Sequence, residues 1–270
     1  MDLRPIILAF LLMAICSASH AADRPSTITL GHEDENAYPW VLENNGVYTG
    51  LDLELIALLR ARIGIEIKTV GYPWTRALVT MQRGELDGVF AASYKPEREK
   101  YGRYPLKGGR LDGDRRIHTS GYSLYILKGS KLRFDGERFE NLVSATGVTD
   151  IGVQRSFSII PSLRRFDVSF NDSSADPAQI LNLLSHNRIA AAAIQTDRAD
   201  QIIAANPLYQ TTIVKYPTNR KPFHLKPYFI MLSHQFVKRY PEFSERFWDA
   251  VEEVRNSSEY RQRKREFYAM

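Results

Sequence analysis

The stretch GLDLELIALLRARIGIEIKTV, residues 50–70, places a helical pattern directly before a strand pattern. Its apolar residues recur at helical spacing up to Gly64, and glycine is favoured where a helix ends. Residues 65–70 then have the composition of a β-strand. The stretch predicts one helix–strand unit of an α/β protein. The residues at helical spacing are Leu51, Leu55, Leu58, Leu59 and Ile63.

Similar units lie on both sides of this stretch. A short β-type run, residues 27–30, precedes it, followed by a polar loop, residues 32–48. After it come a second amphipathic helix that ends at Gly84 and a third strand, residues 89–91. Alternating strands and helices at this spacing predict right-handed crossovers and a mostly parallel sheet.

A second α/β unit begins after residues 101–121, a glycine-rich and charged stretch that predicts an exposed loop leading into a linker. Strands are expected at residues 122–127 and 151–153, and a helix from about Phe157. Asp176 is expected to cap a further helix. The small apolar run 189–194 is typical of a strand buried on both faces.

The last part of the chain is expected to return to a helical layer. Three prolines mark a linker, a strand-like run follows at residues 228–233, and an amphipathic helix starts at about Pro241. The basic end of the chain, residues 261–265, is interpreted as a solvated surface and not as a nucleic-acid patch. The linker prolines are Pro217, Pro222 and Pro227.

The first residues have the pattern of a secretory signal. Arg4 precedes an apolar run, residues 6–15, and a small-x-small site predicts cleavage near Ala21. The single cysteine, Cys16, lies inside this signal, so the mature chain is expected to have no thiol and no disulfide. The formal net charge of +5 is modest and suits an anionic ligand slightly better than a cationic one.

Several motifs occur together in an order that resembles the family 3 extracellular solute-binding proteins, best known as periplasmic amino-acid receptors of ABC importers. Residues 151–154, 187–189 and 241–268 also fall in family order, so the resemblance covers nearly all of the mature chain. The motifs that carry it are Tyr38-Pro39-Trp40, Gly50-Leu51-Asp52-Leu53-Glu54, Pro73-Trp74-Thr75-Arg76-Ala77, Gly84-Glu85-Leu86-Asp87-Gly88 and Lys95-Pro96-Glu97-Arg98.

The resemblance implies the type II periplasmic-binding-protein fold, an α/β architecture of two lobes with mostly parallel sheets. The first lobe would combine residues 22–118 with residues 227–270, after the signal peptide, residues 1–21. The second lobe would comprise residues 122–222. Two hinge segments would join the lobes, and the ligand would lie in the cleft between them.

The resemblance also points to Arg98 as the main ligand-binding residue. The family's Thr-Pro-Glu-Arg arginine grips the ligand carboxylate, and residues 95–98 match three of these four positions. The planar guanidinium suits this task because it can donate two parallel hydrogen bonds to a carboxylate. Without the resemblance, Arg98 would be interpreted as a surface arginine in a charged run.

Other candidate ligand-binding residues follow from their positions in the same pattern. A polar contact is expected from Asp34 in the first loop, and Gln195 occupies the position where amino-acid receptors usually carry an acidic residue for the ligand ammonium. Because a neutral amide cannot match that charge, an amino acid and another organic anion both stay open as ligands. The remaining candidates are Tyr38 and Trp74 for an aromatic wall, Phe90, Ala91 and Ser93 after the third strand, and Ser156, Phe157 and Ser158 at the start of the helix in the second lobe, where the family usually has glycine in place of Ser156.

The sequence lacks the usual signatures of enzymes. It contains no H-x-x-x-H pair for zinc, no G-x-S-x-G elbow and no phosphate-binding glycine loop, so no metal, cofactor or catalytic residue is predicted. A monomeric periplasmic binding protein is expected, with a small-molecule ligand and no nucleic acid. Its membrane partner would be an ABC permease or a membrane sensor. A periplasmic enzyme of the same fold, such as a dehydratase, is the remaining alternative.

Overall fold

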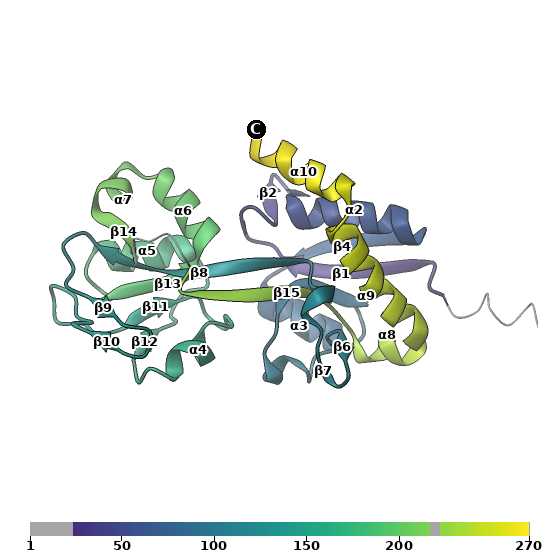
Figure 1. Ribbon diagram of the computed structural model, residues 1–270, viewed down its shortest axis with the longest axis horizontal. Helices are drawn as coiled ribbons and strands as arrows, with labels where there is room; N and C mark the ends of the chain where they lie inside the picture. Colours follow the sequence, from purple (N-terminus) through teal and green to yellow (C-terminus); the bar gives the residue numbers. More distant parts are fainter. Residues whose placement is uncertain (1–23, 217–221, 270) are drawn as a thin grey trace, which may run out of the picture.

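The chain folds into two α/β lobes that are joined by two long strands (Figure 1). The computed structural model describes residues 24–216 and 222–269. The predicted signal segment, residues 1–21, and the linker residue Pro217 lie outside the described residues. Within the described ranges, no helix is both long enough and apolar enough to cross a membrane.

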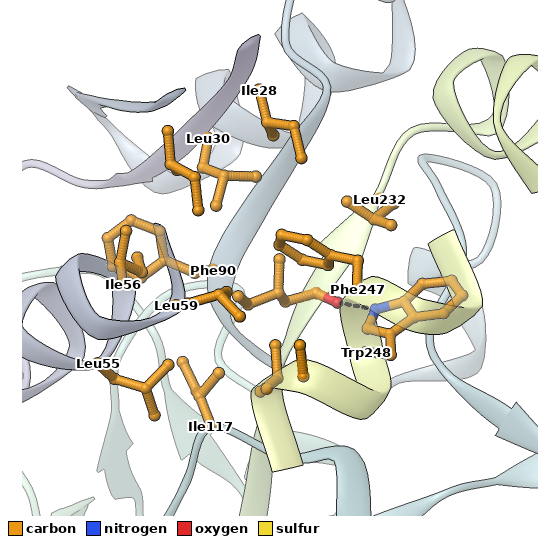
Figure 2. Packing of buried hydrophobic residues seen from close by; sticks show 14 of the residues in the cluster. Ile28, Leu30, Leu55, Ile56, Leu59, Phe90, Ile117, Leu232, Phe247 and Trp248 are labelled. Atoms are coloured by element: carbon orange, nitrogen blue, oxygen red, sulfur yellow. Dashed lines mark hydrogen bonds between the residues drawn. The ribbon is translucent and has the colours of Figure 1, made fainter. Parts of the chain in front are cut away.

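The first lobe contains three parallel strands, β4 (Glu66–Tyr72), β1 (Thr27–Glu33) and β5 (Gly88–Ser93). Its core lies between this sheet and the apolar faces of two helices, with Leu55 and Leu59 from one and Phe247 and Trp248 from the other (Figure 2). The indole Nε1 of Trp248 donates a hydrogen bond of 2.8 Å to the backbone oxygen of Ile230. The helices of this lobe are α2 (Leu51–Ile63), α3 (Trp74–Gln82), α8 (His234–Arg239), α9 (Pro241–Arg255) and α10 (Ser258–Ala269).

The second lobe repeats the same plan with shorter elements. Strand β11 (Ile151–Val153) pairs in parallel with β12 (Phe170–Asn171) and β13 (Ala191–Gln195). Every residue of β13 is buried, as predicted for a strand covered on both faces. Its helices are α4 (Ile160–Arg164), α5 (Pro177–Ser185), α6 (Thr196–Ala204) and α7 (Pro207–Thr212), and a further strand is β14 (Ile213–Tyr216).

Two antiparallel strands, β8 (His118–Leu127) and β15 (His224–Leu232), run from one lobe to the other (Figure 1). His118 lies opposite Tyr228, and Tyr122 lies opposite His224. Toward the second lobe β8 pairs with β13 and β14, while toward the first lobe β15 pairs with β5. One sheet therefore continues through the molecule in the order β12-β11-β13-β8-β15-β5-β1-β4.

Several short elements lie outside the main sheet and its helices. Among the described residues, three two-stranded hairpins lie outside the main sheet, and two 3₁₀ helices of three residues each occur. They are β2 (Leu42–Asn44) with β3 (Val47–Thr49), β6 (Leu106–Lys107) with β7 (Arg110–Leu111), β9 (Arg133–Phe134) with β10 (Phe139–Glu140), η1 (Pro96–Arg98) and η2 (Gly113–Arg115).

Three expectations about local structure are wrong. The helix expected from about Phe157 is the short α4, which begins at Ile160, after a turn in which Ser156 has a positive φ of 64°. The loop at residues 32–48 contains the β2–β3 hairpin. The stretch 101–121 is only partly exposed, since it buries the side chains of Tyr104 and Ile117.

The end of α2 confirms the role predicted for Gly64, which adopts the left-handed conformation at φ 63° and whose N–H bonds to the carbonyl oxygen of Arg60. We expect Gly64→Ala to lower the free energy of unfolding by about 1–2 kcal/mol, since a Cβ is unfavourable in this conformation. Gly64→Asn should lose less, because asparagine tolerates it better. Urea unfolding measures both, and equal stability of all three proteins would contradict this account.

Candidate functional site

The guanidinium of Arg98 lies at the interface between the lobes, at the end of the turn η1 that follows strand β5. The residue is only 6% exposed. Its Nη1 donates to the carbonyl oxygen of Ser93 at 2.7 Å and lies 3.1 Å from Ser93 Oγ. The guanidinium carbon stands 5.1 Å from the ring centroid of Trp74, a cation–π arrangement. Three of the predicted site residues are thus brought together within the first lobe.

The second lobe contributes two more of the predicted residues to the same place. Nη2 of Arg98 donates to the carbonyl oxygen of Ser156 at 3.4 Å. The hydroxyl of Ser93 donates to the hydroxyl of Ser158 at 2.7 Å. Ser93 and Ser158 are 3% and 1% exposed, so this polar contact is closed off from bulk solvent. Arg98 therefore sits where a molecule held between the lobes would touch both of them.

In the part of the chain that the structure describes, no ion pair compensates the charge of Arg98. Among residues 24–216 and 222–269, none of the ion pairs includes it. Carbonyl and hydroxyl oxygens satisfy some of its N–H groups, but they carry no formal charge. A buried charge is costly unless an opposite charge pairs with it. The site is thus suited to an anionic group.

Strand β5 is distorted at Ala91, another predicted site residue, which lies two residues before the end of the strand. Its φ is 56°, a value that alanine rarely adopts, and the β5–β15 register shifts between Phe229 and Met231. This bulge redirects the end of the strand toward the interface. Its neighbour Phe90 is fully buried in the first core, where its ring lies 5.0 Å from that of His32, and so is not brought to Arg98.

Gln195 lies at the end of β13 and faces two buried tyrosines. Its Nε2 donates to the hydroxyl of Tyr228 at 2.8 Å, and this hydroxyl lies 3.1 Å from that of Tyr122. Burial raises the pKa of both tyrosines, so their hydroxyl groups stay protonated. The side-chain oxygen Oε1 of Gln195 accepts a hydrogen bond from Arg198 at 3.3 Å. Both ends of the amide are therefore engaged by protein groups.

Arg198, one turn into α6, links the second lobe to the first. Its Nη1 lies 3.2 Å from Oε2 of Glu33, and its Nη2 donates to the carbonyl oxygen of Asn36 at 2.6 Å. The arginine is 2% exposed, and its guanidinium carbon lies 5.9 Å from the ring centroid of the predicted site residue Phe157. We call the contacts of Arg198 with Glu33 and Asn36 the interlobe latch.

Two of the predicted site residues, Asp34 and Tyr38, make contacts with groups other than Arg98. The backbone N–H of Asp34 bonds to the carbonyl oxygen of Tyr72, and its side chain is half-buried beside the latch residue Glu33. The ring of Tyr38 lies 5.9 Å from that of Phe267 in α10. The first loop therefore forms the edge of the interface between the lobes that lies nearest the interlobe latch.

A buried histidine anchors the crossing strands to the first lobe. The ring of His118 stacks between Trp40, at 3.8 Å, and Tyr228, at 4.7 Å. Its Nδ1 lies 2.7 Å from Oδ1 of Asp52, whose pKa is raised by burial, although His118 partly offsets this. Trp40 is thus a core residue. The arrangement fixes Tyr228, and with it the hydroxyl that contacts Gln195.

Sequence reasoning missed several residues at this interface. Arg198 follows Gln195 by three positions, so the polar residues after the buried strand were a usable signal. Tyr122 and Tyr228 lie in segments predicted as strands. Nothing in the sequence of these segments indicates that the tyrosine hydroxyl groups face the other lobe. Lys226 lies in the predicted linker, and its Nζ donates to the carbonyl oxygen of Ser158 at 2.6 Å.

Two α/β lobes, two crossing strands and a polar interface between the lobes are the features of the type II periplasmic-binding-protein fold. Residues 28–105 match the model of the bacterial extracellular solute-binding proteins, family 3, which confirms the predicted family resemblance. No curated protein sequence matches the chain.

Solved structures share the fold at low sequence identity. An ancestral arginine-binding protein bound to arginine is 16% identical with a TM-score of 0.68, over 90% of this chain and 99% of that one. A histidine kinase sensor domain with similarity to periplasmic binding proteins is 17% identical (TM-score 0.67; 91% and 97% covered). A putative ABC-transporter binding component from Wolinella succinogenes, complexed with lysine, is 13% identical (0.67; 88% and 94%). These likenesses establish the type II binding-protein fold.

Proposed function

We propose that the chain is a periplasmic solute-binding protein that captures a small carboxylate-bearing molecule between its lobes for an ABC importer. The observation that carries this proposal is the buried, unpaired guanidinium of Arg98, which contacts Ser93 of one lobe and Ser156 of the other. A ligand carboxylate placed there would pair with the arginine and touch both lobes at once. Ligand binding would then favour the conformation in which the lobes are in contact.

The segments 118–122 and 222–227 act as the hinge in this proposal. They lie side by side in the antiparallel β8–β15 pair, and the stacked His118 holds them to the first lobe. A rotation about these two strands would separate the latch contacts and the Arg98–Ser156 contact together. Such hinge closure around a ligand is a common mode of motion in binding proteins.

A sensing role is the second candidate. It is supported by the likeness to a histidine kinase sensor domain, which has the same fold over nearly the whole chain. In both roles the membrane partner would recognise the form with the lobes together, so the ligand-binding chemistry is the same. We propose binding without chemical conversion of the ligand in either case.

The proposal predicts that a small carboxylate compound raises the melting temperature of the purified mature protein. A ligand at about a hundredfold excess over its Kd stabilises the folded state by about 2.7 kcal/mol. Differential scanning fluorimetry with amino acids, organic acids, sugars and polyamines measures this, with Arg98→Ala as the matched control. Stabilisation by a sugar or a polyamine but by no carboxylate would refute the proposed ligand chemistry.

A further inference from the structure

Cationic side chains gather on one side of the interface, beyond what a single carboxylate needs. Lys226 of β15 donates to the carbonyl oxygen of Ser158, whose hydroxyl in turn meets Ser93 beside Arg98. Arg98 and Lys226 thus lie at opposite ends of a short chain of hydrogen bonds that passes through Ser93 and Ser158. Lys95, directly before η1, completes the group. We call Arg98, Lys226 and Lys95 the cation cluster.

Electrostatics agrees with this placement. Burial, with Arg98 and Lys95 acting in the same direction, lowers the pKa of Lys226 to about 8. Burial likewise lowers the pKa of Lys95, with Arg98 and Arg164 acting in the same direction. These cations are therefore close enough to repel one another.

Little negative charge from the protein opposes the cluster. Within the two described ranges, none of its three members forms an ion pair. The exposed Glu97 opposes the repulsion between the cations only in part, by raising the pKa of Lys95. The surrounding polar groups include the hydroxyls of Tyr122 and Tyr228, which burial keeps protonated and able to donate hydrogen bonds. Two positive charges would stay uncompensated if the ligand carried a single carboxylate.

Gln195 is poorly suited to bind an ammonium group, because the positive charge of Arg198 lies beside it. Its carbonyl oxygen accepts from Arg198, a cation, and its amide nitrogen donates to Tyr228. Acidic side chains lie instead on the latch side, where Arg198 pairs with Glu33. That side would repel a second carboxylate and direct it toward Lys226.

We propose that the ligand carries two anionic groups, such as a dicarboxylate, with one group at Arg98 and the other at Lys226. This inference rests on the proposed function and adds the charge of the ligand. The cluster and its hydroxyl groups would then bind both anionic groups, whereas a monoanion leaves two of the three cations unpaired.

Pairs of compounds that differ by one charge test the inference. We would titrate succinate against succinamate, glutarate against glutaramate, and L-glutamate against L-glutamine by calorimetry, with L-arginine as a basic competitor. In at least one pair the diacid should bind about ten- to hundredfold more tightly than its monoamide, the usual effect of a charged hydrogen-bonded pair.

Three variants assign the difference to its residue. Lys226→Gln should bring the two compounds of that pair to similar affinities, and Lys95→Gln should reduce the gap in part. The exposed Lys107→Gln is the matched control and should leave the ratio unchanged. Circular dichroism checks that each variant is folded.

The outcomes separate the two proposals. If no diacid binds better than its monoamide, or if arginine binds best, the dianion inference is overturned. Binding of a monoanion or of arginine that Arg98→Ala abolishes would still support the proposed function. Binding that is indifferent to Arg98→Ala would overturn both.

Discussion

Replacing Arg98 by alanine should weaken ligand binding by tens to thousands of times. The side chain is 6% exposed and contacts both lobes, so the variant would leave a ligand carboxylate buried without its partner. Truncating one member of such a pair typically costs about 2–5 kcal/mol, and each tenfold change in affinity corresponds to about 1.4 kcal/mol. Calorimetry with the carboxylate found by thermal screening measures the change.

Two further variants sharpen this prediction. Arg98→Lys should recover only part of the affinity, because a point charge cannot reproduce the two parallel bonds of a guanidinium. Arg103→Ala removes an exposed arginine from the same charged run and should change affinity little. If Arg98→Ala and Arg103→Ala have equally small effects while both proteins stay folded, Arg98 does not hold the ligand.

Arg198→Ala should weaken the binding of any ligand held between the lobes, although no ligand contact is removed. The latch joins Arg198 to Glu33 and to the carbonyl oxygen of Asn36, and it exists only while the lobes are together. A hydrogen bond to a charged group contributes about 1.5–3 kcal/mol, so affinity should fall about ten- to hundredfold. The loss should appear mainly as faster dissociation.

A double-mutant cycle with Glu33→Gln isolates the latch. If the two side chains act through each other, the double variant should lose less affinity than the sum of the single variants. Arg188→Ala, an exposed arginine of the second lobe, is the control. Unchanged affinity in Arg198→Ala would mean that the contact does not stabilise the ligand-bound form.

Elements with strong periodicity could be predicted from the sequence. The apolar face of α2 and the stop at Gly64 occur where residues 50–70 placed them, because helix formation there depends on local spacing and one permissive residue. The β2–β3 hairpin was missed, although Asn45 and Gly46 both have positive φ and the pair is a known turn signal. The start of α4 was placed too early, because hydrophobic spacing does not indicate the turn that contains Ser156 and precedes the helix.

The site was harder to predict, because its contacts join residues far apart in the chain. Arg98 was found through a local motif. The structure places it beside Ser93, Trp74 and Ser156, and beside the contact between the hydroxyl groups of Ser93 and Ser158. Lys226 and Ser158 are 68 positions apart, and Arg198 and Glu33 are 165 apart. No local pattern encodes such pairs, so the latch and the cation cluster emerge only from the folded arrangement. The residue bounds of the lobes and the ligand-binding roles of the candidates stay predictions.

A crystal structure of the protein with its tightest-binding carboxylate tests the central claim most directly. The account predicts that the ligand lies between the lobes, with a carboxylate within hydrogen-bond distance of the Arg98 guanidinium and near the hydroxyl groups of Ser93 and Ser158. A ligand bound elsewhere, with Arg98 still contacting only the protein oxygens of Ser93 and Ser156, would contradict it.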